Sequence, residues 1–289
     1  MDPSRRSLLA TIAAASCRAP EKRRPRVKWP SERPTILLRS GWQTVNIGDI
    51  AHTPGLLRLI ERLIPEAEVM LWTNALDRGV DALLERNFPK VRIVSGETGE
   101  NGEPDTEALR DAFEKADVLV HGSAAGVQRR HLEAWRRRTG KPYGMFGVTV
   151  AASQEAVSQG LDEELRALLE GAEFVFTRET RSLENVRRAG VAKPEVRFVP
   201  HATYSLQLAN EPAAREFLAR NHLEPKKFIA VIPRLRYTPY HKIRKVDWSA
   251  EEIRRRTETN EKHQESDHAK LREVITTWVR RTGHKALLC

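Results

Sequence analysis

A run of polar side chains follows a short apolar segment near the start of the chain. Residues 41–52 read GWQTVNIGDIAH, directly after the apolar run TILLR at residues 35–39. Loops between a strand and a helix bind ligands at the edge of open parallel sheets. Asp49 is an anion at the expected helix start, where it would cap the helix and oppose a bound phosphate. The loop suits sugar hydroxyls, or else it only forms the turn. Its candidate binding residues are Gln43, Asn46, Gly48, Asp49 and His52.

Two later loops also follow predicted strands. The segment HGSAAG at 121–126 carries glycines that permit close approach of a ligand to the backbone, so Gly122 and Ser123 are candidate binding residues. The segment TRETRS at 177–182 places Arg178 at a strand end, where its guanidinium suits a carboxylate or a phosphate. The alternatives are a tight turn in the first loop and an Arg–Glu surface pair in the second.

A basic segment lies farther along the chain. Residues 226–245, KKFIAVIPRLRYTPYHKIRK, contain seven Lys or Arg and no acid. Arg234 and Arg236 come directly after an apolar run, at the end of a strand where ligands usually bind. With Lys242 they suit a small anion, and His241 is a candidate acid or base. The alternative is a solvated basic loop that docks on lipid or acidic glycan.

These loops must be positioned by alternating strands and helices. Apolar runs rich in β-branched residues alternate with helical patterns, which predicts a doubly wound, mostly parallel α/β sheet of the Rossmann-like type. The expected strands are 35–39, 68–73, 91–95, 117–121, 143–149, 173–177 and 196–199. The expected helices are 51–64, 77–87, 105–115, 129–138, 160–170 and 180–189.

A second unit is expected after a helix near 210–222. Its first strand is KKFIAVIPR, a charged segment and a helix near 267–282 follow, and HKALLC reads as another strand. Two strands and one helix bury little apolar surface, so we expect this Rossmann-like domain to be incomplete. The predicted organisation is an export signal and tether at 1–34, a Rossmann-like domain at 35–209, a linker helix at 210–225 and a partial second domain at 226–289.

The charge of the chain is unevenly placed. The net charge is +10, but residues 1–34 hold nine Lys or Arg against three Asp or Glu, a net of +6 that leaves +4 for the rest. The folded part is therefore only mildly basic and has few aromatic residues for base stacking, which disfavours nucleic acid as a partner. No apolar run is long enough for an ordinary membrane span.

The N-terminus, MDPSRRSLLATIAAASC, has the pattern of a twin-arginine export signal. Arg5 and Arg6 precede a short apolar stretch, and Cys17 ends a possible lipoprotein box that lacks the usual leucine. We therefore expect a periplasmic or envelope location, with possible attachment to the membrane surface. A disordered basic tail on a cytoplasmic protein is the alternative. The only other cysteine is Cys289, so neither a disulfide framework nor zinc-ligand spacing is present.

Four segments together resemble the polysaccharide pyruvyl transferase family. The opening VNIGDIAHTPGLLRLIERLIPEAEVMLWT is similar to the family's strand–loop–helix with its Asn-x-Gly-Asp loop. ADVLVHGSAAGV stands at a glycine-rich turn of that family, and GKPYGMFGVTV is like its next strand. AEFVFTRETRSLENVRRAGVAKPEVRFVPHATYSL is similar to its Arg-Asp/Glu-x-x-Ser segment. The order and spacing of these segments carry the resemblance.

The resemblance implies two facing Rossmann-like halves, as in GT-B glycosyltransferases. It also implies transfer of pyruvate from phosphoenolpyruvate to a sugar of a cell-surface polysaccharide. The residues themselves show no metal-ligand cluster and no phosphate-binding P-loop, so we expect no metal and no cofactor. On this reading Arg234 binds the donor, Arg236 and Lys242 support it, and His241 is an acid or base. His201 stands where the family tends to have an acidic residue, and the family's later Arg-x-His segment has no counterpart here.

Two other functions stay open from the sequence. One is a GT-B-type glycosyltransferase that uses a sugar nucleotide, and the other is a non-catalytic, envelope-attached glycan-binding relative. Export also conflicts with phosphoenolpyruvate, which is a cytosolic metabolite. Either the signal prediction is wrong, or the donor differs, or the activity is lost.

Overall fold

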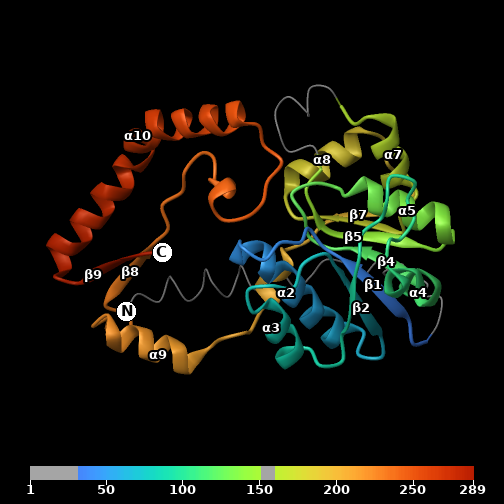
Figure 1. The fold of residues 1–289 in the computed structure, drawn as a ribbon, viewed down its shortest axis with the longest axis horizontal. Coiled ribbons are helices and arrows are strands. Elements are labelled where there is room, and N and C mark those ends of the chain that lie inside the picture. Colours follow the sequence, from blue (N-terminus) through green and yellow to red (C-terminus); the bar gives the residue numbers. More distant parts are fainter. Residues whose placement is uncertain (1–31, 151–159) are drawn as a thin grey trace, which may run out of the picture.

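A computed structural model describes residues 32–150 and 160–289 (Figure 1). The predicted export signal and lipoprotein box lie outside the described residues. In the described part, no helix is both long enough and apolar enough to cross a membrane.

The main body is a seven-stranded parallel sheet in the order β3-β2-β1-β4-β5-β6-β7. This order confirms the predicted doubly wound α/β fold, because the strand sequence reverses direction between β1 and β4. Arg39 at the end of β1 pairs in register with His121 at the end of β4. The strands are β1 (Thr35–Arg39), β2 (Glu68–Thr73), β3 (Arg92–Ser95), β4 (Val118–His121), β5 (Tyr143–Val148), β6 (Phe174–Thr177) and β7 (Glu195–Phe198).

Helices cover both faces of this sheet, which explains why its strands are apolar on both sides. One core cluster joins side chains such as Leu37 and Trp72 to four helices, and the other joins Ile36 and Leu38 to the opposite layer. The first layer contains α4 (Glu107–Lys115), α5 (Arg129–Thr139), α7 (Glu163–Glu170) and α8 (Thr180–Arg188), and the second contains α2 (Ile47–Leu63), α3 (Val80–Asn87) and the 3-10 helix η1 (Ala202–Ser205).

Helix α2 begins earlier than the sequence pattern predicts. It starts at Ile47 rather than residue 51, and the Asn46 side chain accepts a hydrogen bond from the Gly48 backbone N–H. Asn46 is therefore the N-cap, and the expectation that Asp49 caps the helix is wrong. Asp49 lies inside the first turn, where its charge still complements the helix dipole.

A glycine sets the distance between α2 and η1. A Cβ atom on Gly55 would lie 2.3 Å from the carbonyl oxygen of Ala202, so only glycine permits this approach. Ala202 is buried there beside Leu56 and Leu57 of α2. The close contact brings the residues that precede η1 against the first half of α2.

The C-terminal unit is a single strand–helix–strand arrangement. It follows α9 (Glu211–Arg220) and contains the two-stranded parallel sheet of β8 (Phe228–Val231) and β9 (Lys285–Leu288), joined through η2 (Tyr240–Lys242) and α10 (Ala250–Thr282). Helix α10 starts at residue 250, so the predicted start near 267 is wrong. Ser249 accepts from the Glu252 backbone N–H, the Ser-x-x-Glu cap signal that the sequence carries.

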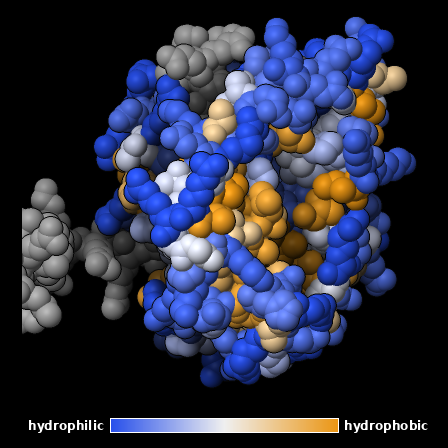
Figure 2. Space-filling view, turned by 90° about the vertical axis from the view of Figure 1, so that its left-hand side faces the viewer, coloured by the Kyte–Doolittle hydropathy of each residue, from blue (hydrophilic) through white to orange (hydrophobic). Residues whose placement is uncertain are grey.

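Helix α10 buries very little of its surface. Asn260 is the only buried residue among its 33, and the helix changes direction part-way along in Figure 1. Viewed from the side of this unit, apolar side chains gather in a central hollow ringed by hydrophilic ones (Figure 2). Exposed large apolar residues of this part of the chain include Phe217, Ile232, Val274, Val279 and Leu288.

Candidate functional site

A polar cluster lies at the carboxyl ends of the central strands, at the point where the strand order reverses. The chain leaves β1 through Ser40 and Gly41 and leaves β4 through Gly122 and Ser123. The Gly41 N–H donates to the Ser123 carbonyl at 2.8 Å, which ties the two loops together. Ligands bind at such switch points in doubly wound sheets.

His201, just before η1, is held in one tautomer. The Thr203 backbone N–H donates to its Nδ1 at 3.3 Å, so the proton is on Nε2. Nε2 lies 2.8 Å from Ser123 Oγ, and that hydroxyl donates to the Gly147 carbonyl at 2.8 Å. Nε2 thus donates to Ser123 Oγ, so Ser123 positions the imidazole and is not activated by it as a nucleophile.

Arg178 joins the same cluster from the end of β6. Its Nε donates to Thr149 Oγ1 at 2.8 Å, and Nη1 lies 3.4 Å from His201 Nε2. The neighbouring Glu179 lies 3.6 Å from Arg178 Nε and also accepts from Thr149. Arg178 keeps 23% of its side chain exposed, so its guanidinium can still reach a ligand.

The opposite side of the cluster comes from α2. The ring of His52 lies 4.6 Å from the ring of His201, and its Nε2 is 3.9 Å from Asp49 Oδ1. Gln43 donates from its side-chain amide to Asp49. Among the described residues, His52 Nδ1 and Gln43 Oε1 are buried without a hydrogen-bond partner. The structure thus brings together three candidate residues from the sequence, which are Gln43, Asp49 and His52.

Both histidines of the cluster are neutral near pH 7. Burial, helped by His52 and Arg178, lowers the pKa of His201 to about 4. Burial also lowers the pKa of His52, against the opposing effect of Asp49. Arg178 is therefore the cation of the cluster, and Asp49 and Glu179 are its anions.

A second polar cluster, which the sequence did not reveal, surrounds Glu97. Arg39 is 3% exposed, donates to Glu97 Oε1 at 2.9 Å, and stacks 5.0 Å from the Trp72 ring. His131 Nε2 lies 3.0 Å from the other Glu97 oxygen. Hydrogen bonds to His131 and the charge of Arg39 outweigh desolvation and lower the pKa of Glu97 to about 2.

His121 links this second cluster to the loop that carries Ser123. Its Nδ1–H donates to the Gly122 carbonyl at 2.8 Å, and Nε2 accepts from the Gln128 backbone N–H at 2.9 Å. Complete burial lowers the pKa of His121 to about 4. The residue fixes the turn after β4 and the start of α5 at once.

The predicted glycines have structural roles. A Cβ on Gly122 would lie 2.3 Å from Ser40 Oγ, so this glycine lets the segments after β1 and β4 pack together. Its contact with a ligand stays a prediction. Gly48 and Asn46 are exposed in the first turn of α2, where Asn46 caps the helix. Of the first predicted loop, Gln43, Asp49 and His52 face the cluster.

The basic residues at 234–242 lie apart from His201 in every contact that the structure records. Arg236 pairs with Asp267 through two hydrogen bonds of 2.6 and 2.9 Å, which raises its pKa. Arg234 and Lys242 are exposed, and His241 has a buried Nδ1 without a partner in the described chain. Their assignment to donor binding and catalysis stays a prediction.

The same segment nevertheless reaches the main body. Arg78 Nη2 donates to the Ile243 carbonyl at 2.9 Å, and Arg244 lines a cavity of about 320 Å³ beyond β1 and β2. Gln43, which donates to Asp49, lines the same cavity. The cavity and the His201 cluster are therefore joined through Gln43 and Asp49.

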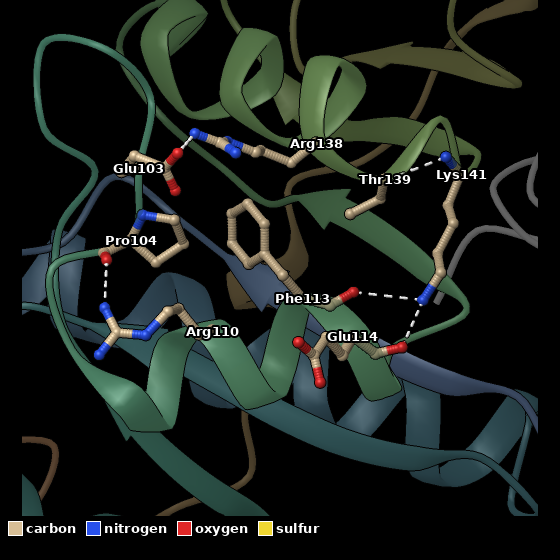
Figure 3. Close-up of a pocket in the computed structure, with 8 residues that line it drawn as sticks. All are labelled: Glu103, Pro104, Arg110, Phe113, Glu114, Arg138, Thr139 and Lys141. Carbon is tan, nitrogen blue, oxygen red and sulfur yellow. Dashed lines mark hydrogen bonds and ion pairs between the residues drawn. The ribbon is translucent and has the colours of Figure 1, made fainter.

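A larger hollow of about 450 Å³ lies between α4 and α5 (Figure 3). The arginines that line it already have partners within the protein. Arg138 pairs with Glu103, and Arg110 donates to the Pro104 carbonyl. Lys141 donates to three carbonyls around the end of α4, those of Phe113, Glu114 and Ala116. These contacts explain the charged side chains around the hollow as structural, without a ligand. Across 32–150 and 160–289, no group of three or more His, Cys, Asp or Glu residues could hold a metal ion.

The parallel doubly wound sheet with a polar cluster at its switch point defines a Rossmann-like α/β protein. Its sequence matches the polysaccharide pyruvyl transferase family over residues 46–276, and the chain belongs to that family. This confirms the resemblance seen in the sequence.

Solved structures with a related arrangement share little sequence with this chain. Anabaena HepE in complex with UDP and glucose has a TM-score of 0.43 at 13% identity, over 72% of this chain and 55% of that chain. UDP-N-acetylglucosamine 2-epimerase from Rickettsia bellii has a TM-score of 0.46 at 11% identity, over 89% and 62%. The match spans little more than half the length of HepE. No curated protein matches the sequence.

Proposed function

We propose that this protein transfers a pyruvyl group from phosphoenolpyruvate to a sugar of a cell-surface polysaccharide. The observation that carries the proposal is the position of Arg178 beside His201, with Nη1 3.4 Å from Nε2, at the switch point of a chain that belongs to the pyruvyl transferase family. A guanidinium with exposed surface suits the carboxylate or phosphate of the donor.

The reaction requires balanced proton movements. Two sugar oxygens form bonds to C2 of the donor, C3 gains a proton to become a methyl group, and the bond from C2 to the phosphate oxygen breaks. The two hydroxyl hydrogens leave the sugar, so one proton is supplied to C3 and one leaves with phosphate. A base at the sugar and an acid near the donor are therefore needed.

Asp49 is positioned to be the base. Its carboxylate lies between Gln43, which lines the cavity beyond β1, and His52, which packs against His201. A sugar held on the Gln43 side would present hydroxyls to Asp49, while the donor lies against Arg178. This order agrees with the expectation from the sequence that the loop at 41–52 suits sugar hydroxyls.

His201 is the proposed acid. It is neutral in the free protein because burial and Arg178 oppose its charge. A donor dianion beside it would favour the imidazolium and raise its pKa. Binding of the donor would thus charge the group that protonates it.

Calorimetric titration with phosphoenolpyruvate tests the proposal. We expect wild-type binding, weakened about tenfold or more by Arg178→Ala, since hydrogen bonds to charged groups contribute this much. Arg187→Ala removes the same charge from an exposed position of α8 and serves as the matched control. A titration of Arg234→Ala decides whether the predicted basic segment contributes.

Product formation is measured with a sugar that offers two neighbouring hydroxyls as the acceptor. NMR detects the methyl group of the ketal, and a phosphate assay detects the leaving group. Binding of UDP-glucose in place of phosphoenolpyruvate would replace the proposal with a sugar-nucleotide transferase. Binding of glycan with neither donor would indicate a non-catalytic glycan-binding protein.

A further inference from the structure

The cavity beyond β1 and β2 has walls from three parts of the chain. Trp42 and Gln43 line it from the loop after β1, Asn74 and Asp77 line it from the loop after β2, and Arg244 reaches it from the C-terminal segment. The Trp42 indole N–H donates to the Ala75 carbonyl at 2.6 Å, which fixes the ring. The cavity thus combines a fixed aromatic ring with polar side chains.

Arg78 occupies an unfavourable backbone conformation at the edge of this cavity. Its φ is +60°, in the left-handed region where glycine is the usual residue, and Gly79 follows at +79°. Such a conformation persists where the surrounding structure holds the residue in it. One such contact is visible, because Arg78 Nη2 donates to the Ile243 carbonyl and holds the C-terminal segment at the cavity.

The charges that face the cavity are mainly positive. Arg78 and Arg244 bring two guanidinium groups, whereas Asp77 brings one carboxylate. Asp77 already accepts from Thr44 and lies 3.5 Å from Arg78 Nε. Arg244 stacks 4.5 Å from the Tyr240 ring and has no acid partner in the described chain. An uncompensated positive charge therefore remains.

We propose that this cavity binds a sugar unit that carries a negatively charged group, a carboxylate or a phosphate, within the acceptor. The guanidinium groups of Arg78 and Arg244 hold the anion, while Asn74 and Gln43 hydrogen-bond hydroxyls. The inference rests on the proposed function, since Gln43 connects this cavity to Asp49. The inference states that the acceptor is acidic, and the family match says nothing about the charge of the acceptor.

Binding by full-length protein is measured by NMR titration with matched pairs of small sugars. The carboxylate pair is methyl glucuronide and its neutral methyl ester, and the phosphate pair is glucose 1-phosphate and methyl glucoside. We expect the anion of at least one pair to bind about tenfold or more tightly than its neutral partner. The pair that shows the preference identifies the anionic group.

Arg78→Gly provides the decisive variant. Glycine relieves the positive φ, which offsets part of the cost of the lost Ile243 contact, so the variant should still fold while it loses the preference for the anion. Arg244→Ala should also lose it, and Arg86→Ala, an exposed arginine of α3 away from the cavity, should retain it. A preference unchanged in both Arg78→Gly and Arg244→Ala, equal binding within both pairs, or no binding of any sugar would overturn the inference.

These titrations contain no pyruvyl donor. The acidic-sugar preference can therefore hold when phosphoenolpyruvate fails to bind, and it can fail when pyruvyl transfer to a neutral sugar is observed. The two proposals are thus separable by experiment.

Discussion

Ser123 Oγ lies 2.8 Å from His201 Nε2, yet it accepts a hydrogen bond from that nitrogen and donates its own to the Gly147 carbonyl. A serine activated for attack would instead donate to the histidine. The pair therefore positions the imidazole beside Arg178. It gives the turn after β4 a role in the site without making Ser123 a nucleophile.

Replacing Ser123 separates these roles. We expect Ser123→Ala to lower pyruvyl transfer by less than about tenfold, because only the orientation of His201 is relaxed. His201→Ala should lower it about 100-fold or more, as expected for loss of an acid. Steady-state rates of phosphate release measure both. Equal and complete inactivation by the two changes, with intact folding, would mean that Ser123 reacts directly.

The titration of His201 should respond to the donor. In the free protein its pKa is about 4, so the ring is neutral through the physiological range. Phosphoenolpyruvate bound at Arg178 brings negative charge next to the ring and should raise this pKa toward or above the ordinary value of about 6.5. NMR of the ring protons across pH, with and without donor, measures the change. An unchanged pKa at saturating donor would remove His201 as the acid.

Gly55 controls the approach of His52 to His201. Gly55→Ala adds a Cβ where the Ala202 carbonyl now lies at 2.3 Å, so α2 and η1 must separate. We expect a loss of about 1–3 kcal/mol in the free energy of unfolding, despite the better helix propensity of alanine. Urea unfolding measures this loss, and Gly126→Ala, where a Cβ meets nothing within 4 Å, is the control. Unchanged stability and activity in Gly55→Ala would show that the approach is not required.

Much of this arrangement follows from the sequence, and the exceptions have physical reasons. The alternation of apolar runs and helical patterns predicts the parallel sheet, because a strand buried on both faces must be apolar throughout. It also places Arg178 and the 41–52 loop at one sheet edge. The pairing of His52 with His201 depends on Gly55, whose close contact joins segments far apart in the chain, and no local pattern reveals it.

Charged residues inside the sheet were harder to foresee. Arg39 ends the apolar run TILLR and reads as a boundary residue, yet it is buried against Glu97. Its partner, Glu97, lies in the loop after β3. This loop reaches Arg39 only because β1, β2 and β3 are neighbours in the folded sheet. The apolar pattern predicts only the second half of α10, because the first half has no apolar stripe; Ser249 and Glu252 form the cap signal that marks its true start.

Burial of neutral histidine makes stability depend on pH. The pKa of His121 is about 4 in the folded protein and about 6.5 when unfolded, so the unfolded chain binds more protons between these values. Stability is therefore full above about pH 6.5 and falls as pH is lowered toward 4. His121 alone should account for about 2 kcal/mol of loss by pH 5. Urea unfolding at pH 7 and pH 5 measures it, and His121→Asn should lose less between the two; an equal loss would contradict the assignment.

The location of the protein can be tested apart from its chemistry. Residues 1–34 fused to a reporter should direct export, because Arg5 and Arg6 precede a short apolar stretch in the twin-arginine pattern. Changing Arg5 and Arg6 together to lysine keeps the charge and should abolish export, since the signal is read as arginine. The same change at Arg23 and Arg24, in the tether, is the matched control and should leave export intact. Export of the lysine variant would remove the twin-arginine reading, and retention of the wild-type fusion would favour a cytoplasmic protein with direct access to phosphoenolpyruvate.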